Sequence, residues 1–135
     1  MDTHNWLGRE GEAHAFRYVE EKLGMRLLER NWSFNHKEVD LIATDGAVLV
    51  FFEVKTRSED YHYAPALAVD RKKRMNICFA ANYYSRMKQY KLPLRFDILS
   101  VVYRPATGLF EIEHIPNAFR PEPHFYGRGR RPYRR

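Results

Sequence analysis

Residues 39–55 read VDLIATDGAVLVFFEVK, two apolar runs separated by the dipeptide Asp45-Gly46. An Asp-Gly dipeptide between apolar runs is the strongest short-range signal for a β-hairpin. A two-residue turn pairs Thr44 with Ala47, and this register puts six apolar residues on one face: Val39, Leu41, Ala43, Val48, Val50 and Phe52. We therefore predict that this face packs against the core.

The opposite face of the hairpin carries charged residues away from the turn. The predicted register sets Glu38 directly across from Glu53, with Asp40 as the diagonal neighbour, at Cβ separations of roughly 4.5 to 8 Å. Carboxylates this close repel one another, and a divalent cation would remove the penalty. Carboxylate oxygens are hard ligands suited to Mg²⁺ or Mn²⁺. We expect Asp40 and Glu53 to bind such an ion, with Glu38 beside them.

Lys55 lies two residues beyond Glu53 and therefore points the same way. An ammonium group beside the ion would hold the attacking water and stabilise charge developing on a phosphoryl group, while the metal lowers the pKa of that water. This pattern favours phosphodiester hydrolysis. The alternative is a solvated strand surface with cross-strand ion pairs, which is common, and the hairpin alone leaves both interpretations open.

Helical patterns flank the hairpin. A first helix is predicted from about residue 5 to 23, ended by Gly24, with Glu12 at the end of its apolar stripe. Glu12 either borders the acidic site or interacts with the helix dipole. A second helix is predicted over residues 66–88, and Lys73 at its start would reach the sheet face or a phosphate. The core-facing residues expected on this helix are Ile77, Ala81, Tyr84 and Met87.

Three further strands are predicted, at residues 26–34, 94–103 and 109–115, and Pro116 is expected to end the last one. A polar loop is predicted over residues 57–65. The resulting order, αβββαββ, indicates an α/β domain with a central mixed β-sheet flanked by helices.

Composition and charge divide the chain into a body and a tail. The 135 residues are 44% hydrophobic and 30% charged, which is typical of one soluble domain, here residues 1–119. No apolar run approaches the roughly 18 residues of a membrane span, and the single Cys78 fits a cytoplasmic location. Of the net charge of +6, residues 120–135 contribute +5, from six arginines and one glutamate. This tail is predicted either to be a flexible solubilising end or to bind nucleic acid through Arg128, Arg130 and Arg131.

Several motifs in this order resemble the YraN family of small bacterial proteins. They are Gly8-x-x-Gly11-Glu12-x-x-Ala15, Arg30-Asn31, Glu38 to Ala43, Phe52 to Arg57, Lys73, Arg95-Phe96-Asp97 and His114 to Phe119. The resemblance covers about residues 8–119. The chain departs from the pattern at Lys37, where the family usually has Gly, and at Val39, where the wider superfamily has Pro.

The YraN family is similar to the PD-(D/E)xK nucleases and in particular to archaeal Holliday-junction resolvases. This resemblance implies a restriction-endonuclease-like αβββαβ core. It also implies that Asp40 and Glu53 bind the metal, that Lys55 assists the water and that Glu12 completes the acidic site. A homodimer is expected by analogy with the resolvases.

Three functions follow as hypotheses. The first is a Mg²⁺- or Mn²⁺-dependent endonuclease acting on branched or structured DNA, with Arg57 and Lys73 among the nucleic-acid contacts. The second is a non-catalytic nucleic-acid-binding module on the same fold, and the third is an RNA-processing nuclease. The histidines and Cys78 have no zinc-site spacing, and no glycine-rich phosphate loop is present.

Overall fold

The computed structural model describes residues 3–60 and 69–121, and these form the elements predicted, in the predicted order. The two helices are α1 (Thr3–Glu21) and α2 (Arg71–Met87). The five strands are β1 (Arg26–Phe34), β2 (Lys37–Thr44), β3 (Leu49–Ser58), β4 (Leu94–Arg104) and β5 (Leu109–Phe119). No helix among the described residues is long and apolar enough to cross a membrane.

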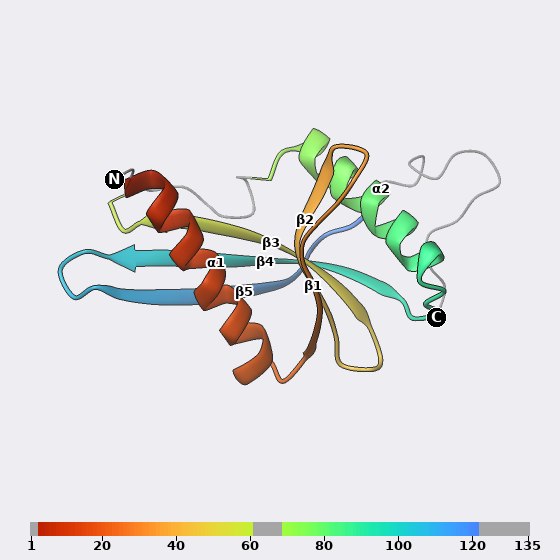
Figure 1. Cartoon of the computed structure of the whole chain (residues 1–135), viewed down its shortest axis with the longest axis horizontal. Coiled ribbons are helices and arrows are strands. Elements are labelled where there is room, and N and C mark those ends of the chain that lie inside the picture. Colours follow the sequence, from red (N-terminus) through yellow and green to blue (C-terminus); the bar gives the residue numbers. More distant parts are fainter. Residues whose placement is uncertain (1–2, 61–68, 122–135) are drawn as a thin grey trace.

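The strands form one mixed sheet in the order β1-β2-β3-β4-β5. Strands β3 and β4 run parallel, and every other neighbouring pair is antiparallel. The parallel pair is joined by a connection that contains α2, since parallel strands need a long crossover. Figure 1 shows the strong twist of the sheet, in which β1 and β2 run across the direction of β4 and β5. The predicted fold class, a mixed sheet flanked by helices, is therefore confirmed.

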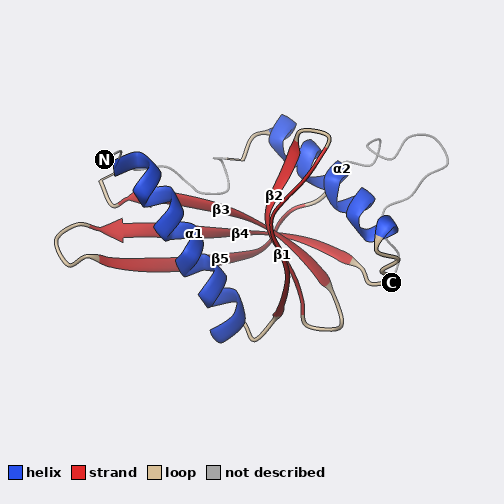
Figure 2. Ribbon diagram, viewed as in Figure 1, coloured by secondary structure: helices blue, strands red, loops and turns tan. Residues whose placement is uncertain are grey.

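The two helices cover opposite faces of the sheet, and Figure 2 shows α1 crossing β3, β4 and β5 while α2 lies near β2. One apolar cluster joins α2 to the sheet and contains Ile42, Leu49, Phe51, Ile77, Ala81, Tyr84 and Ile98. The other joins α1 to the sheet and contains Ala15, Val19, Leu41, Ala43, Val50, Phe52 and Leu99. Both faces of the central strands are thus buried.

The prediction of a single core face on the hairpin was therefore wrong. The run from Leu49 to Phe52 has no polar residue because β3 is a central strand with a helix on each side, and such strands are continuously apolar. Val39 was expected beside Leu41 but packs in the α2 cluster. Asn31 lies between the Arg30–Leu41 and Trp32–Val39 pairs. Its left-handed φ of 49° interrupts the pleat there.

The hairpin turn is also longer than predicted. Thr44 pairs with Leu49 rather than with Ala47, so residues 45–48 form a four-residue connection. The Asp45 carboxylate accepts hydrogen bonds from the backbone N–H groups of Ala47 and Val48, at 2.8 and 3.1 Å, and these bonds favour the wider turn. The register moves by two residues, so Glu38 is not across from Glu53. Leu41, Ala43, Val50 and Phe52 still share one face, because side-chain direction also has a period of two.

The second helix begins later than predicted. Asp70 caps it, because its carboxylate accepts a 2.8 Å hydrogen bond from the backbone N–H of Lys73. The first residues of the predicted helix, 66–68, lie outside the described part of the chain. Met87 was expected to face the core but is 47% exposed on the last turn, whereas Tyr84 is buried.

The last strand is longer than predicted and continues through Pro116 to Phe119. Strand β5 is at the edge of the sheet, where a proline removes no ladder hydrogen bond that another strand requires. The register between β4 and β5 shifts between the Ile98–Ile115 and Phe96–Phe119 pairs, so the strand passes the proline with an irregularity rather than a break.

Candidate active site

Asp40 and Glu53 lie where the backbone pairing of β2 and β3 ends. The last pair in register is Leu41 with Phe52, so one further step would set Asp40 opposite Glu53. In place of a further ladder bond, the Asp40 carboxylate accepts a 2.8 Å hydrogen bond from the backbone N–H of Val54. The Asp40 side chain therefore bridges the two strands and is held in one position by the sheet itself.

The Glu53 carboxylate is buried and has cations around it. Glu53 is only 3% exposed. Its Oε2 lies 3.2 Å from Nζ of Lys73 and 3.6 Å from Nζ of Lys55. Lys55 comes from the same strand, whereas Lys73 comes from the first turn of α2 on the face that α2 covers. The carboxylate is inside and both ammonium groups are at its rim.

Glu12 reaches this region from α1. The helix approaches β3 closely at the preceding residue, because a Cβ added to Gly11 would overlap the Thr56 side chain. Glu12 is half-buried, and burial followed by the charge of Glu38 raises the pKa of its carboxyl, with a smaller upward effect from Glu53. The structure thus brings the predicted fourth carboxylate within electrostatic range of the others.

Negative charge at this point is not fully compensated. Burial raises the pKa of Asp40 to about 8, and the charges of Glu53 and Glu12 add to the increase, against the hydrogen bond from Val54. Partial burial opposes the charge on Lys73, but Glu53 and Asp40 outweigh it and raise the pKa of Lys73. The arrangement therefore favours an added cation beside Asp40.

The donor set fits a hard divalent cation held mainly by water. Among residues 3–60 and 69–121, no three His, Cys, Asp or Glu side chains are arranged to hold a metal ion. Mg²⁺ is commonly bound by one or two carboxylates and keeps several waters. Asp40 and Glu53 meet that requirement, since both are oxygen donors, Asp40 is half-buried and Glu53 is buried, and the charge of Glu53 disfavours the charged form of Asp40.

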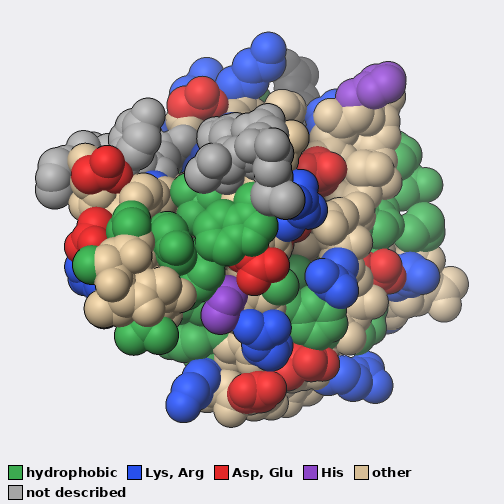
Figure 3. Space-filling view, turned by 60° about the vertical axis from the view of Figure 1, so that its left-hand side comes forward, with side chains coloured by type: hydrophobic (Ala, Val, Ile, Leu, Met, Phe, Trp, Pro, Cys, Tyr) green, Lys and Arg blue, Asp and Glu red, His purple; other side chains and the backbone are tan. Residues whose placement is uncertain are grey.

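The other predicted nucleic-acid contacts are not gathered at this point. Arg57 lies farther along β3, half-buried, in register with Val102 of β4. Arg128, Arg130 and Arg131 lie outside the described residues. On the face in Figure 3, acidic and basic side chains are interspersed with hydrophobic ones, as expected for a body of net charge +1.

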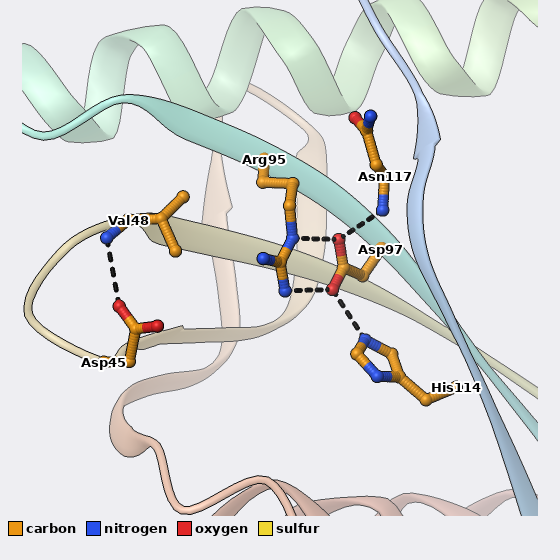
Figure 4. Close-up of polar contacts among 6 residues, drawn as sticks. All are labelled: Asp45, Val48, Arg95, Asp97, His114 and Asn117. Atoms are coloured by element: carbon orange, nitrogen blue, oxygen red, sulfur yellow. Dashed lines mark hydrogen bonds and ion pairs between the residues drawn. The ribbon is translucent and has the colours of Figure 1, made fainter. Parts of the chain in front are cut away.

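A second buried carboxylate, Asp97, was matched in the sequence but given no role. Figure 4 shows its surroundings on β4 and β5. Arg95 donates from Nε and Nη2 at 2.9 and 2.8 Å, the backbone N–H of Asn117 donates at 2.9 Å, and Nε2 of His114 lies 2.7 Å away. Asp97 joins β4 to β5 at the irregularity beyond Pro116. The Arg-x-Asp spacing on one strand face was the signal available in the sequence.

The comparison with known proteins agrees with the sequence motifs. A model of the family described as uncharacterised protein family UPF0102 matches residues 11–101. The chain belongs to this family. The UPF0102 match includes Glu12, Asp40, Glu53, Lys55 and Lys73, and it confirms the resemblance to the YraN family.

Relatives in several bacteria match along nearly their whole length. A UPF0102 protein of Parabacteroides distasonis is 44% identical over 119 residues, covering 88% of this chain and 96% of the relative. One from Bacteroides thetaiotaomicron is 41% identical, covering 90% and 98%. One from Geobacter metallireducens is 39% identical, covering 88% and 97%. The UPF0102 fold is therefore shared over the whole body of the chain.

Proposed function

We propose that this protein is a divalent-metal-dependent endonuclease that hydrolyses phosphodiester bonds in structured or branched DNA. The observation that carries the proposal is the Asp40–Glu53 pair, a half-buried and a buried carboxylate at the end of a strand ladder with ammonium groups at their rim. A merely solvated strand surface would leave these carboxylates exposed. Burying them together has a cost that a bound cation offsets.

Asp40 and Glu53 would hold the ion, Mg²⁺ or Mn²⁺. When bound, the ion would polarise the phosphoryl oxygen and make a bound water a stronger nucleophile. The backbone N–H of Val54 keeps the Asp40 carboxylate oriented. Lys55 is 26% exposed at the rim, where its ammonium group would contact the attacking water and the developing negative charge on phosphorus.

Two further residues would adjust the charge of the site. Lys73 neutralises Glu53 when no cation is present and would contact a substrate phosphate when one is. Glu12 would complete the acidic cluster from the opposite helix. The resemblance to resolvases adds the proposal that two copies act together as a homodimer, which light scattering on the purified protein would test.

The test is a cleavage assay on four-way-junction, flap, single-stranded and duplex DNA and on matched RNA, in Mg²⁺, Mn²⁺ or EDTA. We expect cleavage only with a divalent ion, and a loss of about 100-fold or more in Asp40→Asn and Glu53→Gln. Lys55→Met should lose activity with little change in stability. Glu113→Gln, an exposed acid on β5, is the matched control. Cleavage that persists unchanged in the Asp40 and Glu53 variants would contradict the proposal.

A non-catalytic nucleic-acid-binding module is the second candidate. The 3.2 Å Lys73–Glu53 contact favours it, because an internal cation already pairs with one of the two carboxylates. This candidate predicts salt-dependent binding with no cleavage of any substrate in any divalent ion. The RNA arms of the same assay separate an RNA-processing nuclease from a DNA enzyme.

A further inference from the structure

A cavity of about 320 Å³ lies where the first half of α2 meets the end of β5. Its wall includes Arg71, Arg74, Met75 and Cys78 from α2, Phe119 from the end of β5 and Arg120, which follows that strand. The four helix residues are spaced so that they share one face of α2. This face is next to the one that carries Lys73 and Ile77 against the sheet.

The cavity gathers positive charge. Three arginines line it, and no lining residue is acidic. Within residues 3–60 and 69–121, neither Arg74 nor Arg120 forms an ion pair with a carboxylate. Like charges in one cavity repel one another, and an anion bound between Arg74 and Arg120 would offset their repulsion. Guanidinium groups present planar, paired donors that match a phosphate.

The position of the cavity relates it to the candidate active site. Lys73 and Arg74 are consecutive, with Cα atoms about 3.8 Å apart, and the first contacts Glu53 while the second lines the cavity. Their side chains leave the helix about 100° apart, so a nucleic acid strand with one phosphate at Glu53 and Lys55 would have to turn along α2 to bring another phosphate to Arg74. The apolar wall formed by Met75 and Phe119 would keep water away from that contact and strengthen it.

We propose that this cavity binds one backbone phosphate of the nucleic acid strand, next to the phosphate at the Asp40–Glu53 site. The proposal rests on the proposed function for its ligand, but it concerns binding and needs no cleavage. Arg74 and Arg120 are the principal donors, from different elements. The cavity thus sets how the strand lies across the active site.

The experiment measures binding of the full-length protein to a fluorescein-labelled single-stranded oligonucleotide in EDTA, by anisotropy over a series of salt concentrations. We expect Arg74→Ala/Arg120→Ala to weaken binding about 10-fold and to reduce the slope of log K against log salt by about 0.7, the value for one phosphate on a single strand. The control, Arg86→Ala/Lys91→Ala, removes two exposed cations outside the cavity and should change affinity less than about 3-fold.

A charge-conserving variant and a competition experiment with free phosphate distinguish binding through paired guanidinium donors from attraction to positive charge alone. Arg74→Lys/Arg120→Lys keeps the charge but loses the paired donors, so its affinity should fall between those of the wild type and the alanine variant. Inorganic phosphate should compete better than chloride of equal ionic strength against the wild type, and equally against the alanine variant. Thermal unfolding establishes that each variant is folded.

Equal losses in the cavity variant and in the control, or phosphate competition that persists in the alanine variant, would overturn the inference. Phosphate and chloride could compete equally with the oligonucleotide for the wild type while the alanine variant still has the smaller slope of log K against log salt. The cavity then binds only a phosphate that is part of a strand. Cleavage by the wild type with unaltered binding by the cavity variant removes this inference and leaves the proposed function intact. Weakened binding by the cavity variant, together with no cleavage by the wild type, removes the proposed function and leaves this inference intact.

Discussion

Asp97 and Asp40 lie in the same sheet, on β4 and β2, but their carboxylates have opposite surroundings. Asp97 is fully buried and is contacted by the Arg95 guanidinium, the His114 ring and the backbone N–H of Asn117. Asp40 accepts a hydrogen bond from Val54, and burial, followed by the charges of nearby carboxylates, raises its pKa. The first carboxylate is satisfied by the chain, and the second lies among like charges.

This contrast separates a structural acid from the acid that we propose to be functional. A buried carboxylate with an arginine and two further partners has no capacity left for a ligand, and its removal leaves those partners uncompensated. A carboxylate among other acids keeps oxygen lone pairs free for a ligand, and repulsion from those acids destabilises its charged form. Strained electrostatics of the second kind are typical of functional sites.

The largest expected effect is on stability, at Asp97. Asp97→Asn should destabilise the protein by about 3 kcal/mol, because it leaves the Arg95 charge without its buried partner. Urea unfolding measures the change, and Glu113→Gln, exposed on the neighbouring strand, should stay within about 0.5 kcal/mol of the wild type. A loss below about 1 kcal/mol at Asp97 would show that the cluster is not structural.

The next effect concerns two glycines of α1 in a matched pair. Gly11→Ala should cost about 1 to 3 kcal/mol, because the new Cβ overlaps Thr56 and pushes α1, with Glu12, away from β3. Gly8→Ala has nothing within 4 Å of the new Cβ, so it should stabilise the helix by up to about 1 kcal/mol. Thermal unfolding of both variants tests this. Opposite signs are expected, and equal signs would contradict the close approach of α1.

Asp40 predicts a pH dependence of the stability. The folded-state pKa of Asp40 is about 8, above its ordinary value of 3.8, so the folded chain binds the proton more tightly than the unfolded chain. This contribution to stability is present below about pH 4 and is lost as the pH rises toward 8. In EDTA, the stability of the wild type relative to Asp40→Asn should fall through this window by on the order of 1 kcal/mol per pH unit. Urea unfolding from pH 5 to 9 measures it, and a flat difference would contradict the prediction.

The smallest effect is expected at Glu12, which is only half-buried. Glu12→Gln removes a charge that Glu38 and Glu53 disfavour, so stability in EDTA should rise by a few tenths of a kcal/mol after solvent screening. Glu20→Gln, an exposed acid on the same helix, is the control and should have no measurable effect. A loss of stability in Glu12→Gln would mean that its contact with Asn31 outweighs the repulsion.

Much of the site could be predicted from the hairpin because strand periodicity tolerates errors. The turn at Asp45 was predicted two residues too short, but Asp40, Glu53 and Lys55 still share one face, since a shift of two residues preserves alternation. What failed was the identity of facing pairs, which depends on the hydrogen bonds of the Asp45 side chain. Those bonds belong to a particular turn geometry that a dipeptide motif does not specify.

Other features depended on contacts between distant segments. Pro116 was read as the end of a strand because its missing N–H is costly inside a sheet, yet β5 is an edge strand and continues to Phe119. The role of Asp97 required His114 and Asn117 to be placed beside it by the pairing of β4 with β5. The contact between Lys73 and Glu53 depends on where along β3 the first turn of α2 lies.

The sequence by itself established the element order, the group of charged residues at the end of the hairpin away from its turn, and family membership. These follow from periodicity and motif order, which are local properties of the chain. Folding determined which carboxylates are satisfied and which are not. Asp40 and Asp97 are the same residue type on apolar strands, and their difference lies in the groups that the other strands and helices bring to them. Electrostatic energy depends on distances in space and on burial, and neither is a property of sequence spacing.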